Sequence, residues 1–185
     1  MSGPMTESTA EPVLLVEHRG RVTLATLNRP RKGNALSTGL INALDALCVE
    51  TERRQVTGRT GALVLAGAGE KAFSAGADIN DLVGLSIDRA RAQMRRGQQV
   101  FDRLERLPVV VVAALGGFAL GGGLELAMAA DLRIAGPGAM LGQAEITLAN
   151  IPGWGGTQRL PRLVGRGRAT EMILTGEDRK STRLN

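Results

Sequence analysis

Short apolar runs alternate along the chain with longer segments in which apolar residues recur every three or four positions. Residues 13–16 and Val22–Leu27 flank an Arg-Gly-Arg segment, and this arrangement predicts a β-hairpin. The runs at 62–66, 109–115 and 132–135 have the length and composition of further strands, and 109–115 is apolar enough to be buried. Strands are therefore expected at intervals between residues 13 and 135.

Two segments have the periodicity of amphipathic helices. The first begins after Ser37, a residue type suited to helix capping, and its apolar stripe is Leu40, Ile41, Leu44, Leu47 and Cys48. The second ends before Pro108, and its stripe is Ala90, Met94, Gly97, Phe101, Leu104 and Leu107. Because strands alternate with helices, we expect an α/β protein with a largely parallel sheet.

The segment at 116–125 (GGFALGGGLE) connects a predicted buried strand to a predicted helix. Its glycines remove the Cβ atoms that would keep a ligand away from the backbone. We expect the triple glycine to begin the helix, so that its first N–H groups are free to meet an anion. Glu125 follows Gly122 by about one turn, which places a carboxylate beside such a donor. This combination suits proton transfer coupled to charge on an oxygen, although an ordinary turn with a solvated glutamate explains it equally well.

Two further segments have a similar character. Residues 73–79 (FSAGADI) form a second loop of small residues, where backbone N–H groups can approach a ligand. Glu145 precedes a glycine-rich turn at 151–157. Each feature alone is typical of a surface loop. Two glutamates at loop–helix junctions, together with two donor loops, favour an active site.

The composition restricts the chemistry. The chain of 185 residues is 43% hydrophobic and 2% aromatic, so aliphatic side chains must fill its core. A net charge of +5 is compatible with nucleic acid, and equally with a polyanionic nucleotide or coenzyme A. A single histidine, His18, and a single cysteine, Cys48, argue against a thiolate metal cluster, a disulfide or a histidine-dependent nucleophile. A dinucleotide fingerprint after the strand at 62–66 is only weakly indicated, because no helical pattern follows it.

Several stretches resemble the crotonase superfamily, and enoyl-CoA hydratases in particular. They are residues 27–36 (LNRPRKGNAL), 73–79 (FSAGADI), 119–127 (ALGGGLELA) with Asp131, 142–145 (GQAE) and 151–160 (IPGWGGTQRL). They occur in the family's order, and the resemblance covers about residues 13–177. It implies the crotonase fold, an α/β spiral of ββα units. The family's C-terminal helical region is expected to be missing, since residues 178–185 do not match its pattern.

The resemblance also implies roles for individual residues. The backbone N–H groups of Ala77 and Gly122 would form an oxyanion hole for a thioester carbonyl, with Glu125 and Glu145 as the catalytic pair. Further residues would line the acyl-CoA site, with Gly153 beginning a helix that faces the thioester: Ala75, Gly76, Asp78, Ile79, Gly121 and Gly153. The basic residues Arg31, Lys32 and Lys71 would lie near the coenzyme A phosphates, although a solvated basic loop explains them nearly as well. No metal and no separate cofactor is implied, because coenzyme A is part of the substrate.

These residues suit the hydration of a trans-2-enoyl thioester, in which one carboxylate activates water and the other carboxyl protonates C2. The alternatives are double-bond isomerisation on the same scaffold, and a non-catalytic acyl-CoA-binding or RNA-binding relative. The glutamate pair argues against an inactive binder. The scarcity of aromatic residues among basic ones argues against RNA.

Three segments are expected along the chain: a disordered tail at 1–12, a core domain at 13–177 and an unstructured end at 178–185. No signal peptide and no apolar run of membrane-spanning length is evident, so a cytoplasmic protein is expected. For full-length members the resemblance also implies a homo-oligomer, a trimer or a hexamer, but without the C-terminal helices this chain is not expected to form it readily.

Overall fold

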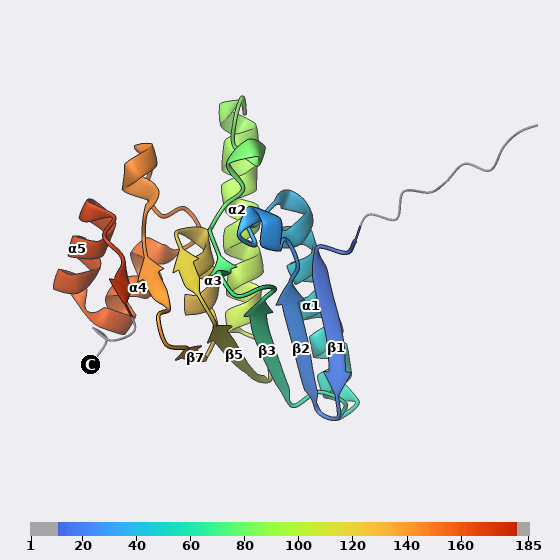
Figure 1. Ribbon diagram of the computed structural model, residues 1–185. Coiled ribbons are helices and arrows are strands. Elements are labelled where there is room, and N and C mark those ends of the chain that lie inside the picture. Colours follow the sequence, from blue (N-terminus) through green and yellow to red (C-terminus); the bar gives the residue numbers. More distant parts are fainter. Residues whose placement is uncertain (1–10, 181–185) are drawn as a thin grey trace, which may run out of the picture.

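The computed structural model describes residues 11–180 (Figure 1). A five-stranded sheet has the order β1-β2-β3-β5-β7, and its strands are β1 (Leu14–Arg19), β2 (Val22–Leu27), β3 (Ala62–Gly67), β5 (Val110–Leu115) and β7 (Leu132–Ala135). β1 pairs with β2 antiparallel, as the hairpin pattern predicts, and the remaining pairs are parallel. The predicted strands and the largely parallel sheet are confirmed.

Helices α1 (Thr38–Val56) and α2 (Ile87–Glu105) pack side by side against one face of this sheet (Figure 1). Alternate strand residues face them and are buried, among them Leu63, Leu65 and Val111. The backbone N–H of Leu40 donates to the Ser37 side chain at 3.3 Å, so the predicted cap is confirmed. The whole predicted apolar stripe of α1 is buried.

A second, smaller sheet has the order β4-β6-β8-β9. Its strands are β4 (Ala72–Ser74), β6 (Phe118–Leu120), β8 (Met140–Gly142) and β9 (Arg179–Lys180). β4, β6 and β8 run parallel, so their carboxyl ends lie at one edge of the sheet. This edge carries the segments that the sequence singles out, and it positions the candidate site. α3 (Gly122–Met128), which is entirely buried, begins two residues after β6.

The remaining elements surround that edge or follow it. They are the short 3₁₀ helices η1 (Pro30–Lys32), η2 (Ile79–Asp81) and η3 (Glu145–Leu148), then α4 (Gly156–Val164) and α5 (Arg166–Thr175). α4 and α5 lie at the end of the molecule opposite β1 (Figure 1). Among residues 11–180, no helix has both the length and the apolar character that a membrane span requires.

Two expectations change. Residues 72–74 form a strand within a segment expected to be a loop, because their backbone pairs with β6. The expected unstructured end is wrong for Arg179–Lys180, whose backbone pairs antiparallel with β8. Residues 1–10 and 181–185 lie outside the described residues.

Gly97 in α2 allows close packing against the only tryptophan. A Cβ at Gly97 would lie 2.3 Å from Trp154 Nε1, and the indole also meets Phe101 edge to face with ring centroids 5.6 Å apart. Gly97→Ala should therefore lower the free energy of unfolding by about 1–3 kcal/mol, because overpacking outweighs the gain in helix propensity.

The control is Gly39→Ala in α1, where the nearest atom to an added Cβ is Ser37 Oγ at 3.8 Å. That variant should be as stable as the wild type or more stable by up to about 1 kcal/mol. Chemical denaturation of both variants tests the packing. Equal stability of the two variants would contradict it.

Candidate active site

The backbone N–H groups of Ala77 and Gly122 lie close together, beyond the ends of β4 and β6. Leu36 N donates to Gly76 O at 2.8 Å, and Asp78 N donates to Leu36 O at 3.1 Å. In a parallel bridge of this kind, the N–H of the residue between, Ala77, faces the opposite side. Gly122 is the first residue of α3, so its N–H has no acceptor within the helix. In the described part of the chain, neither N–H donates to another protein group.

Glycine makes their close approach possible. A Cβ on Gly122 would lie 3.3 Å from Ala77 N, and one on Gly76, which has φ +99°, would lie 3.2 Å from Gly122 N. Larger residues at either position would separate the two segments or block the space between them. Two donors side by side, both without an acceptor in the described part of the protein, suit a single oxygen that carries negative charge.

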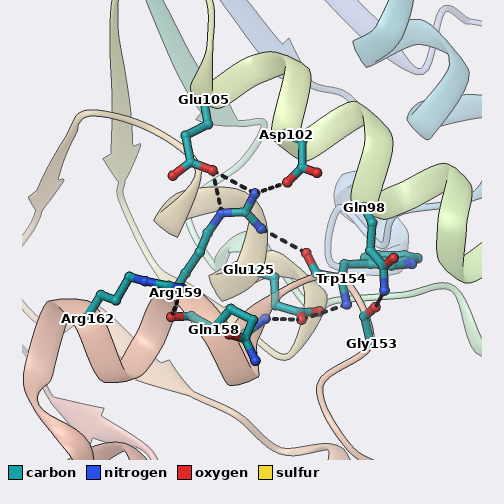
Figure 2. Close-up of polar contacts among 10 residues, drawn as sticks. Gln98, Asp102, Glu105, Glu125, Gly153, Trp154, Gln158, Arg159 and Arg162 are labelled. Atoms are coloured by element: carbon teal, nitrogen blue, oxygen red, sulfur yellow. Dashed lines mark hydrogen bonds and ion pairs between the residues drawn. The ribbon is translucent and has the colours of Figure 1, made fainter.

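Glu125 lies in the first turn of α3 with only 2% of its surface exposed. Its Oε1 accepts hydrogen bonds from Trp154 N at 2.8 Å and Gly156 N at 2.7 Å, at the start of α4 (Figure 2). Burial and the charge of Glu145 raise the pKa of Glu125 to about 7, against the lowering effect of the two N–H donors and of Arg159. Glu125 can therefore exchange a proton near neutral pH.

Glu145 begins η3, three positions after β8 ends at Gly142, and it is half-buried. Burial raises its pKa. The side chain of the fully buried Gln143 faces the Glu145 carboxyl group. With its amide nitrogen turned toward Glu145, Gln143 donates hydrogen bonds to Oε1 at 2.9 Å and to Oε2 at 3.0 Å. A Cβ on Gly121 would lie 3.1 Å from Glu145 Oε1, so this carboxyl group lies against the turn that begins α3.

Both glutamates and both donor segments line one cavity of about 200 Å³. The rest of its lining is mainly apolar and comes from η2, α2, η3 and the segment before α4: Ile79, Leu82, Met94, Leu148, Ile151 and Trp154. This lining suits a hydrophobic ligand with one polar group at the donors. Among residues 11–180, no group of three or more His, Cys, Asp or Glu side chains could hold a metal ion.

Most of the predicted site residues come together here. Ala77, Gly122, Glu125 and Glu145 line the cavity, as do Ala75, Gly76, Ile79, Gly121 and Gly153. Their roles toward a ligand stay predictions.

Asp78, Arg31 and Lys71 do not line the cavity. The Asp78 carboxylate turns to Arg29, with Oδ2 2.7 Å from Nη2, and this hydrogen bond lowers its pKa. Arg31, in η1, and Lys71, in the loop before β4, are both exposed. Their segments are neighbours, since a Cβ on Gly69 would lie 3.4 Å from Pro30 Cβ. Their assignment to coenzyme A stays a prediction.

One structural expectation is wrong. Gly153 does not begin a helix, because the chain first turns through Gly155 at φ +110°, and α4 begins at Gly156. The sequence reasoning also missed Gln143, which contacts Glu145, and Arg159, which contacts the turn at Trp154. Gln143 lies two positions before Glu145 in the segment 142–145, and this proximity is the signal that could have identified it.

Known proteins resemble the chain over most of its length. The family model described as enoyl-CoA hydratase/isomerase matches residues 17–182. A short-chain-enoyl-CoA hydratase of Clostridium acetobutylicum is 44% identical over 168 residues, which are 91% of this chain and 63% of that protein. A crotonyl-CoA hydratase of Syntrophomonas wolfei is 42% identical over 165 residues, 89% of this chain and 62% of that protein.

The fold agrees with solved structures. The crystal structure of an enoyl-CoA hydratase from Bacillus anthracis superposes with a TM-score of 0.87 at 42% identity, covering 92% of this chain and 65% of that one. The chain thus spans somewhat less than two thirds of the length of these relatives. Because the family model covers nearly the whole sequence, the chain belongs to the enoyl-CoA hydratase/isomerase family.

Proposed function

We propose that the protein is an enoyl-CoA hydratase, which adds water reversibly across the 2,3 double bond of a trans-2-enoyl-CoA thioester. One observation carries the proposal. Two carboxyl groups, both with raised pKa values, line the same small cavity as two adjacent N–H donors that have no acceptor among residues 11–180. The names of the hydratase relatives support it.

In the proposed reaction, the thioester oxygen accepts hydrogen bonds from Ala77 N and Gly122 N. The Glu125 carboxylate takes a proton from water as the water oxygen bonds to C3, and the electrons of the double bond move to the thioester oxygen. Glu145, as the acid, gives its proton to C2, and the thioester carbonyl re-forms. One water molecule is added in total, and proton exchange then restores the two carboxyl groups.

The raised pKa values of Glu125 and Glu145 suit this exchange of protons. A base that titrates at about 7 is about half ionised at neutral pH, where proton transfer in either direction is efficient. Double-bond isomerisation needs only one carboxyl group to move a proton between carbons, so a second carboxyl group in the cavity favours hydration. For the full-length family the resemblance supports a trimeric or hexameric assembly, and a cytoplasmic location also belongs to the proposal.

We expect Glu125→Gln and Glu145→Gln each to lower kcat for hydration by about a hundredfold or more, because each removes one proton-transfer group. The loss of conjugated-thioester absorbance with crotonyl-CoA measures the rate. Glu17→Gln is the matched control, since Glu17 lies exposed on β1, and it should behave like the wild type. Near-normal hydration by either site variant would exclude that glutamate from the chemistry.

Glu125 should also make stability depend on pH. Its pKa is about 7 in the folded protein against an ordinary value of 4.5. Between these values the unfolded chain is ionised while the folded protein keeps the proton, so the free energy of unfolding falls as pH rises. Above pH 7, Glu125→Gln should be more stable than the wild type by on the order of 3 kcal/mol, whereas near pH 4 this difference should vanish.

Urea denaturation at several pH values measures this difference. The exposed Glu17→Gln variant should show no comparable gain at high pH. If Glu125→Gln is no more stable than the wild type at pH 8, ionisation of Glu125 does not lower the free energy of unfolding.

A further inference from the structure

Arg159, in the first turn of α4, is a buried cation outside the cavity described above, with 8% of its surface exposed. Its Nη2 lies 2.6 Å from Asp102 Oδ1 and 2.8 Å from Glu105 Oε2, and its Nε donates to the same Glu105 oxygen at 3.0 Å. Both acids belong to α2 and are about half exposed. Figure 2 shows the guanidinium between these acids and the turn that precedes α4.

The remaining contact of Arg159 is with that turn. Its Nη1 donates to Trp154 O at 3.0 Å. A Cβ on Gly155 would lie 2.2 Å from the same nitrogen, so the close approach depends on glycine at this position. The guanidinium therefore lies directly against the backbone between Trp154 and Gly156.

Three consecutive peptide groups connect this contact to Glu125. The peptides that end in Trp154 N and Gly156 N both donate to Glu125 Oε1. The peptide between them presents Trp154 O to Arg159. Since neighbouring peptide planes share an α-carbon, the orientation of the middle one limits the orientation of both donors.

We infer that Arg159 is a positioning residue for Glu125, which acts by fixing the turn whose two N–H groups hold this carboxylate. The inference deepens the proposed function, because Glu125 is the proposed base. The alternative is that Arg159 only joins α2 to α4, through Asp102 and Glu105. The two roles differ in their effect on the titration of Glu125.

The charged groups that act on Glu125 are Glu145, from η3, and Arg159, from α4. The charge of Arg159 and the two backbone donors favour the ionised form, whereas burial and Glu145 favour the protonated form. Loss of Arg159 removes a cation and loosens both donors. Each change disfavours the carboxylate, so the titration midpoint should move to higher pH.

The test is a ¹³C NMR titration of the Glu125 carboxyl group in the 185-residue chain, assigned by its absence in Glu125→Gln. In Arg159→Met the midpoint should rise by about one pH unit above the wild-type value. Arg159→Lys keeps the cation but not the planar fork of donors, and its midpoint should lie between those two. Arg162→Met is the matched control, because Arg162 is exposed on the same helix and contacts Gln158 O, and its midpoint should equal the wild-type one.

Wild-type midpoints in both Arg159 variants would overturn the inference. A wild-type midpoint in Arg159→Lys alone would show that charge suffices, and would overturn the positioning role. If Arg159→Met does not fold, Arg159→Lys decides: a raised midpoint supports the inference and an unchanged one refutes it. Because the titration needs no substrate, it stands even if the chain fails to hydrate enoyl-CoA, which would refute only the proposed function.

Discussion

The site depends on one interaction, the pair of hydrogen bonds that Glu125 Oε1 accepts from Trp154 N and Gly156 N. Without these donors, burial to this extent would raise the pKa of the carboxyl group far above its usual range. The two donors offset part of the cost of burial and leave the pKa at about 7. They also connect α3 to the start of α4, so the same contact that sets this pKa holds two helices together.

The Trp154 side chain connects this site to α2 through close packing. A Cβ on Gly97 would lie 2.3 Å from its Nε1, and a Cβ on Gly122 would lie 2.6 Å from its Cζ3. The indole thus fits between α2 and the first residue of α3, and both contacts need glycine. Since Gly122 also supplies one of the unpaired N–H donors, core packing and the geometry of the donors depend on the same side chain.

Local features were predictable from the sequence pattern, and the grouping of Glu125, Glu145 and the two donor segments was predictable from the family resemblance. Other long-range contacts were predictable from neither. The apolar pattern located the strands of the larger sheet and both long helices, but not the short strands of the smaller sheet. The Ser37 cap needed only its own helix. Asp78 was expected to line the cavity, but it does not. Its carboxylate pairs instead with Arg29, which is 49 positions away in the chain. Likewise, α4 begins at Gly156, after a turn in which Trp154 N donates to Glu125, and Arg159 pairs with acids on α2. No local pattern reveals either contact.

The most direct test of the account is a crystal structure of the chain with butyryl-CoA, a saturated thioester that cannot be hydrated. We predict that the thioester oxygen lies within hydrogen-bonding distance of both Ala77 N and Gly122 N, with C2 and C3 facing Glu125 and Glu145. A thioester bound elsewhere would contradict the account, for example in the separate cavity of about 480 Å³ that Asp102 and Arg159 line.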